Sequence, residues 1–218
     1  MHIKRYLNPC FIRLFYHAKN IGWLFLIPIF IFIVLIPILN YMQYVTGGIN
    51  QELYLNIIRY SQWLMPFFSV WNVIFSLHES VESEGYELFY MKNHHLKLID
   101  TLVIYGVSFI FITFLFVFYG FLFPNMWLEY IRIVSISFLF LGIAYGGTYL
   151  FKSITPTLII LILYVFASIV FVSHYPVFLL FYTLEIMSWQ LFFEHYSILL
   201  LLGCVCFLVG FFASKKYY

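Results

Sequence analysis

The sequence has very few charged residues for its length. Only 11 of its 218 residues are Lys or Arg and 9 are Asp or Glu, and the formal net charge is +2. The basic residues are spread along the chain and form no patch with interleaved aromatics, which argues against nucleic acid as a partner. Because 64% of the residues are hydrophobic, too little polar material remains to cover a globule in water. The surrounding medium is therefore predicted to be the lipid bilayer.

Cysteine and catalytic motifs are also scarce. The three cysteines lie near or inside apolar segments and show neither a disulfide framework nor the CxxC spacing of a zinc site. No G-x-S-x-G nucleophile motif occurs. The nearest match to an ATP-binding loop, Gly142 to Gly147 followed by Thr148, lacks the required lysine. We therefore predict that the chain is not an enzyme and holds no metal or other cofactor of its own.

Long uncharged stretches dominate the sequence. A bilayer core about 30 Å thick needs roughly 20 apolar residues per helix, and six stretches reach that length. The sequence therefore predicts an all-α, polytopic membrane protein in which residues 21–218 form one transmembrane domain. The six spans are expected near residues 21–44, 57–78, 101–122, 130–151, 156–173 and 196–213.

The positions of Lys and Arg predict the orientation. Basic residues in short loops favour the cytoplasmic side of a membrane. With the N-terminus inside, only Arg59 and Arg132 fall on the outer side, both at span ends. The other basic residues are then cytoplasmic: Lys4, Arg5, Arg13, Lys19, Lys92, Lys97, Lys152, Lys215 and Lys216. We predict a multi-pass protein of the cell inner (cytoplasmic) membrane with both termini in the cytoplasm.

Residues 1–20 show the pattern of an amphipathic helix. Ile3, Leu7 and Leu14 recur at helical spacing and alternate with Lys and Arg. Such a basic amphipathic helix is typical of the inner membrane surface. The alternative is a basic tail that only sets the orientation.

Residues 79–98 form the only sizeable predicted cytoplasmic loop, between the second and third spans. The segment reads E-S-V-E-S-E-G-Y-E-L-F-Y-M-K-N-H-H-L-K-L, with acidic residues first and apolar residues after them. This mixture is suited to docking into a groove of a partner protein. The alternative is a solvated acidic turn followed by a stretch that rests on lipid.

Residues 173–195, on the outer side between the fifth and sixth spans, are too apolar for an exposed loop. We predict short re-entrant or interfacial helices there, because irregular backbone at membrane depth must be surrounded by protein or line a cavity. The alternative is an aromatic belt at the headgroups.

The fourth span contains Gly142, Gly146 and Gly147. Their GxxxG-type spacing predicts close helix packing, either within one subunit or between two copies of the chain.

Together these features resemble the permease subunits of type-2 ATP-binding cassette (ABC) exporters, and the topological match covers the full chain. Glu82, Gly85, Glu87 and Leu88 look like that family's cytoplasmic loop, which forms the coupling helix. The family commonly has a Pro several residues later and a Lys where the next span begins. In this chain that region carries instead Lys92, Asn93 and Asp100.

The resemblance implies several partners. A separate ABC ATPase subunit would bind ATP and Mg and dock beneath the loop, and a second permease copy or paralogue would complete the transporter in the lipid bilayer. The implied ATPase-coupling residues are Glu79, Glu82, Glu84, Gly85, Glu87, Leu88 and Met91. The implied cargo is a hydrophobic peptide, an antimicrobial compound or a lipid.

Other classes of protein remain as alternatives. A non-transporting immunity or sensor protein would share the topology. An intramembrane metalloprotease is suggested by His78 and Glu79, but its H-E-x-x-H motif needs a second His where Glu82 stands. A secondary transporter would be expected to place ionisable residues at mid-membrane, whereas Asp100 and Lys152 map to span ends.

Overall fold

The computed structural model of the protein describes residues 14–82, 94–171 and 186–215, and in these ranges all regular structure is helical. The all-α prediction is therefore confirmed for the described residues. Beyond the N-terminal helix (residues 14–21), the elements are η1 (Gly22–Phe25), α2 (Leu26–Phe30), η2 (Ile31–Leu35), α3 (Ile36–Gly47), α4 (Gln51–Ser69), α5 (Trp71–Val81), α7 (His94–Leu122), α8 (Met126–Phe151), α9 (Ile154–Phe171), α10 (Trp189–Leu191), η4 (Phe192–Tyr196) and α11 (Ser197–Lys215). Of the η elements, η1 is a 3₁₀ turn, whereas η2 and η4 are π turns.

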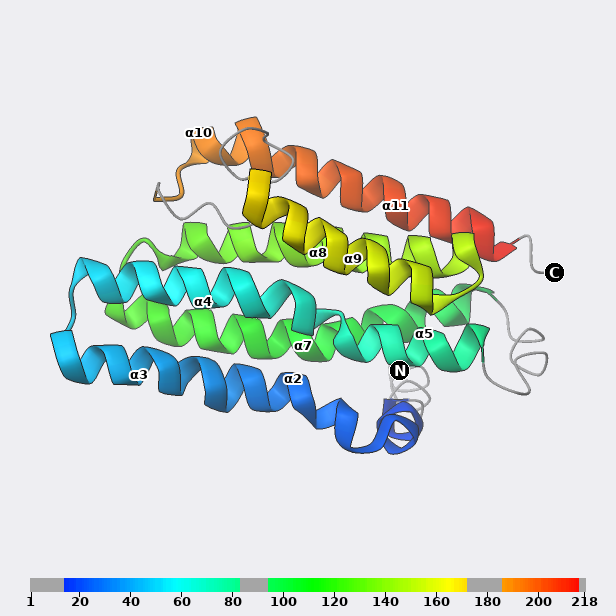
Figure 1. The fold of residues 1–218 in the computed structure, drawn as a ribbon, viewed down its shortest axis with the longest axis horizontal. Helices are drawn as coiled ribbons and strands as arrows, with labels where there is room; N and C mark the ends of the chain where they lie inside the picture. Colours follow the sequence, from blue (N-terminus) through cyan, green and yellow to red (C-terminus); the bar gives the residue numbers. More distant parts are fainter. Residues whose placement is uncertain (1–13, 83–93, 172–185, 216–218) are drawn as a thin grey trace, which may run out of the picture.

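The long helices run side by side along the long axis of the molecule (Figure 1). Helix α8 packs against α4, α5, α7, α9 and α11. In its most apolar window, 72% of the residues are buried, against 22% for both the N-terminal helical stretch and the stretch that ends in α11. Helix α8 is therefore the centre of the bundle, and the other two present much of their apolar surface outward.

Among the described residues, four helical stretches are long and apolar enough to cross a membrane. They are Leu14–Gly47, Lys97–Leu122, Met126–Phe151 and Trp189–Lys215. Many large apolar side chains on them are exposed, among them Phe114, Phe121 and Leu201. Such extensive apolar exposure is unfavourable in water, so this surface is suited to contact with lipid.

The other two predicted spans have less regular counterparts. The span predicted at residues 57–78 corresponds to α4 and α5, which are separated by a break at Val70. The hydroxyl of Ser69 donates to the carbonyl of Pro66 at 2.7 Å, and the N–H of Val70 is directed to the carbonyl of Phe68. The regular backbone hydrogen bonds of the helix are therefore interrupted there. The span predicted at 156–173 corresponds to α9, whose apolar helix covers Ile154–Ser168. The six-span topology therefore stays a prediction.

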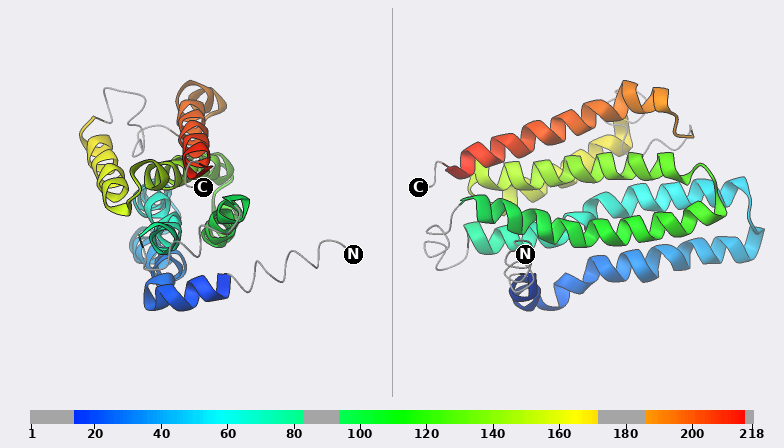
Figure 2. Two further views of the ribbon diagram at one scale, coloured as in Figure 1. Left: turned by 90° about the vertical axis from the view of Figure 1, so that its right-hand side faces the viewer. Right: turned by 180° about the vertical axis from the view of Figure 1, so that it is seen from behind.

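The chain turns sharply at Gly22. Residues 14–21 form a helix that lies across the long axis of the bundle, as the left view of Figure 2 shows. Gly22 has a φ of +63°, a conformation that glycine adopts without steric penalty. Residues 1–13 lie outside the described residues, so only the end of the predicted amphipathic helix is seen. There Phe15 and Tyr16 are exposed, and Leu14 packs against the core.

Two of the predicted packing glycines lie where α8 meets α11. A methyl group on Gly142 would overlap the backbone carbonyl of Gly203, and one on Gly146 would overlap that of Cys206. Gly147 instead faces α9. We call the contact of Gly142 and Gly146 with α11 the glycine interface. These contacts are all within one chain.

The last helix begins earlier than expected. Residues 172–185, most of the predicted re-entrant segment, lie outside the described residues. From Trp189, α10 and η4 continue directly into α11. The helix therefore starts at Trp189 and not near residue 196.

Candidate functional site

The helices that flank the predicted cytoplasmic loop end at the same end of the bundle. Helix α5 ends at Val81 and α7 begins at His94, at the same end as the C-terminus of α11 (Figures 1 and 2). Of the predicted coupling residues, Glu79 and Glu82 are described. The others lie outside the described residues: Glu84, Gly85, Glu87, Leu88 and Met91.

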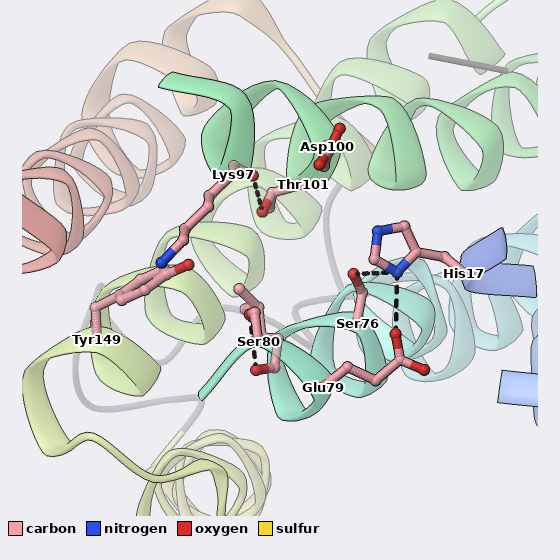
Figure 3. Close-up of a pocket in the computed structure, with 9 residues that line it drawn as sticks. His17, Ser76, Glu79, Ser80, Lys97, Asp100, Thr101 and Tyr149 are labelled. Carbon is pink, nitrogen blue, oxygen red and sulfur yellow. Dashed lines mark hydrogen bonds and ion pairs between the residues drawn. The ribbon is translucent and has the colours of Figure 1, made fainter. Parts of the chain in front are cut away.

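A small polar cleft lies at this end (Figure 3). Its side chains come from the N-terminal helix, α5, α7 and α8. The lining residues are His17, Ser76, Leu77, Glu79, Ser80, Lys97, Asp100, Thr101 and Tyr149. We call this group the polar cleft.

On one side of the cleft, His17 joins the N-terminal helix to α5. Its Nδ1 lies 3.1 Å from Oε2 of Glu79 and 3.3 Å from Oγ of Ser76. Both side chains of the His17–Glu79 pair are partly buried, and the contact is an ion pair when His17 is protonated. Glu79 is thus engaged within the chain.

On the other side, α7 contributes Lys97 and Asp100, each only 8% exposed. They are one helical turn apart, and Thr101 beside them donates its hydroxyl to the carbonyl of Lys97 at 2.9 Å. Figure 3 shows the Lys97 side chain extending toward Tyr149 of α8. Buried charged residues of this kind are rare unless they are paired, so the cleft is a specific feature of this end of the bundle.

Glu82 holds the first turn of α9. Its Oε1 accepts the N–H of Ile154 at 2.7 Å and the hydroxyl of Ser153, and its Oε2 lies 3.5 Å from Nε2 of His78. The hydrogen bond from Ser153, with further contributions from Ile154 and His78, holds the pKa of the Glu82 carboxyl below its usual value. The carboxylate therefore acts as a helix cap supplied from a distant part of the chain.

Two acidic residues at the start of the loop thus connect it to distant parts of the chain. Glu79 contacts the N-terminal helix, and Glu82 contacts the turn between α8 and α9. The sequence predicted that Glu79 and Glu82 contact a partner protein, but it did not predict their contacts within the chain. The partners of Glu82 are 71 and 72 positions away, and no local pattern indicates a cap over such a separation.

A buried ion pair lies toward the other end of α8. Nη1 of Arg132 is 3.2 Å from Oε2 of Glu129, and the two side chains are 0% and 1% exposed. Oε1 of Glu129 accepts the N–H of Met187 at 2.8 Å and the hydroxyl of Tyr54 at 3.4 Å. The Arg132 guanidinium also lies over the ring of Tyr196, 5.3 Å from its centroid. The pair therefore joins α8 to α4, η4 and the residues before α10.

The sequence analysis placed Arg132 on the outer side at a span end, and it did not predict that this side chain is fully buried. Helix α8 begins at Met126 and not near residue 130, so Arg132 lies in its second turn. Glu129 is three residues earlier, on the same face of the helix, and its carboxylate balances the charge. The E-x-x-R spacing is the signal that indicates such a pair. The pair lies in the first two turns of α8 and not at its middle.

The described ranges contain no group of three or more His, Cys, Asp or Glu side chains that could hold a metal ion. At the H-E-x-x-E segment, Glu82 is engaged with α9 and His78. The described part of the chain therefore supplies no ligand set for the metalloprotease alternative.

No family model, curated protein or solved structure matches this chain. In the part of the chain that the structure describes, all regular structure is helical and four helices are candidates to span a membrane. Its function must be inferred from the site itself.

Proposed function

We propose that this chain is the membrane-spanning permease subunit of an ABC exporter, powered by a separate ATPase subunit. The observation that carries the proposal is the root of the 79–98 loop. Part-buried polar contacts join Glu79 to the N-terminal helix and Glu82 to α9, and the helices on both sides of this loop line the polar cleft together with the N-terminal helix and α8. A force applied to the loop would therefore reach several helices at once.

The arrangement of the helices supports a six-span topology. At about 1.5 Å per residue, α4 and α5 together extend about 45 Å, and α9 extends about 27 Å, close to the thickness of a bilayer core. Six crossings return the chain to the side from which it started. Lys97, Lys152 and Lys215 all lie at the end of the bundle that carries the loop. Under the positive-inside rule this end is cytoplasmic.

The proposed mechanism begins in the partner. ATP binding would bring two ATPase subunits together and push on the loop between α5 and α7. The Glu79–His17 contact would transmit the movement of α5 to the N-terminal helix, and Glu82 would transmit it to α9. Because the glycine interface lets the backbones of α8 and α11 approach closely, these two helices would move as one body. Such rigid-body movement would open a path between two permease subunits.

The proposed cargo is a hydrophobic peptide, an antimicrobial compound or a lipid. Aromatic residues make up 24% of the chain, and aromatic walls can bury large apolar ligand surfaces.

Co-purification tests the proposal. The tagged chain is extracted from membranes of its native host in mild detergent, and the retained proteins are identified by mass spectrometry. We expect an ATPase with a phosphate-binding loop, and we expect the double substitution Glu87→Ala and Leu88→Ala to release it. Glu52→Ala, an exposed acid in the first turn of α4 at the opposite end, is the matched control. Recovery of only a kinase or a toxin, or equal retention of the ATPase by all variants, would refute the proposal.

A further inference from the structure

An apolar groove lies between α3, α4 and α7, toward the end of the bundle opposite the polar cleft. It has a volume of about 530 Å³, within the range of small-molecule sites in proteins. Its lining includes Val34, Asn40, Leu53, Tyr119 and Leu122. None of its lining residues is charged. The groove is therefore suited to an apolar chain.

The groove has one buried polar pair. Nδ2 of Asn40 donates to the hydroxyl oxygen of Tyr119 at 2.7 Å. Asn40 is only 5% exposed, and its Oδ1 has no hydrogen-bond partner among the described residues. The hydroxyl proton of Tyr119 is not used in this bond and can donate. Asn40 and Tyr119 both line the groove, and a buried acceptor without a partner, such as Oδ1 of Asn40, is unusual.

The depth of this pair indicates the kind of ligand. Asn40 lies seven residues before Gly47, where α3 ends, so it is about 10 Å below the helix end. The exposed Tyr41 and Tyr44 line the groove nearer that end, as is typical of aromatic residues at a membrane interface. A ligand here has its polar group just below the interface and its apolar chain deeper.

We propose that this groove binds an acyl chain of a diacylglycerol from the membrane leaflet at that end. An ester carbonyl of the lipid accepts the hydroxyl proton of Tyr119, and a glycerol hydroxyl donates to Oδ1 of Asn40. The exposed Ile38 and Phe118 line the groove and also face outward from candidate spans, so a lipid can enter sideways from the bilayer.

This inference rests on the membrane location of the chain and not on the ATPase partner, so the two proposals can fail separately. The full chain is reconstituted in nanodiscs that contain a diacylglycerol with a diazirine on one acyl chain. After illumination, the sites of cross-linking are mapped by mass spectrometry. We expect the adducts to concentrate on peptides that contain residues 33–57 and 118–122.

Substitutions distinguish a specific lipid-binding site from non-specific contact between lipid and the protein surface. Val34→Phe fills the groove and is expected to remove most of these adducts, whereas Val205→Phe on the exposed face of α11 should not. Asn40→Leu and Tyr119→Phe each remove one hydrogen bond, so each should lower cross-linking by about five-fold. A diazirine alkane without ester or hydroxyl should be insensitive to Tyr119→Phe. Thermal unfolding confirms that each variant is folded.

Two results would overturn the inference. The first is an even distribution of adducts over all the exposed apolar faces of the bundle. The second is an unchanged pattern in folded Val34→Phe protein.

Discussion

Glu129 and Arg132 depend on each other inside the bundle. Removing one partner of a buried ion pair typically costs about 3–5 kcal/mol, whereas replacing both with groups of similar volume can be nearly neutral. We therefore predict that Glu129→Gln and Arg132→Met each lower the melting temperature of the detergent-solubilised protein. The double variant should be more stable than the sum of the single effects implies. The measurement is thermal unfolding of the three variants and the unchanged protein.

Glu194→Gln is the matched control for this cycle, because Glu194 is exposed and pairs with Gln190 on the surface of η4. It should change the melting temperature little. Strictly additive effects of Glu129→Gln and Arg132→Met would contradict the account of a coupled pair.

The Glu82 cap predicts a dependence on pH. Because folding lowers the pKa of Glu82 from its ordinary value of 4.5, its stabilising contribution is fully present above that value. It is lost as the pH falls through the lower pKa of the folded state. Glu82→Gln should therefore melt earlier than the unchanged protein at pH 7 and approach it at about pH 4 and below. Curves of melting temperature against pH that stay parallel would show that the carboxylate makes no such contribution.

At the scale of the helices, the glycine interface fixes the distance between α8 and α11. A methyl group on Gly142 or Gly146 would meet the backbone of α11, whereas one on Gly106 or Gly120 of α7 has no atom within 4 Å. We predict that Gly142→Ala and Gly146→Ala destabilise the folded protein. Gly106→Ala and Gly120→Ala should be neutral or stabilising by up to about 1 kcal/mol, because alanine favours helix. Chemical or thermal unfolding in detergent measures both pairs.

Equal effects at the four glycines would mean that α8 and α11 are not held by backbone contact. Loss of dimers without loss of stability would instead place Gly142 and Gly146 at a contact between two copies of the chain.

The sequence predicts helices well because apolar length is a property of each segment alone. The stretch around Gly142, for example, has no charged residue from Ile133 to Phe151, and α8 covers the span that was expected there, although it begins four residues earlier. The break at Val70 was missed because it depends on a hydrogen bond from the hydroxyl of Ser69 to the backbone carbonyl of Pro66. A hydropathy pattern does not contain that geometry.

The site could be predicted only in part for the same reason. The acidic residues near 79–82 were selected for their composition, and they do lie at the root of the loop. Their contacts with His17, Ser153 and Ile154 depend on how distant helices pack. The groove at Asn40 and Tyr119, which are 79 positions apart, has no local signal in the sequence.

At the scale of the whole molecule, the proposed topology predicts which turns face the cytoplasm. With the native cysteines replaced by serine, single cysteines are placed at Ile49, Asn125, Lys152 and Lys215, and intact cells are treated with a membrane-impermeant maleimide. Ile49→Cys and Asn125→Cys should react, because they lie at the end assigned to the outside. Lys152→Cys and Lys215→Cys should react only after the cells are permeabilised. Reaction of Lys152→Cys in intact cells would reverse or break the proposed topology.

The central claim is that a nucleotide-hydrolysing subunit docks at the loop between α5 and α7. The most direct measurement is photo-cross-linking in the native host from a photoreactive amino acid at Leu88, with the same residue at Ile49 as the control. The account predicts a cross-link from position 88, but not from position 49, to an ATPase with a phosphate-binding loop. No cross-link to such an ATPase from position 88, in folded protein at its normal membrane level, would contradict it.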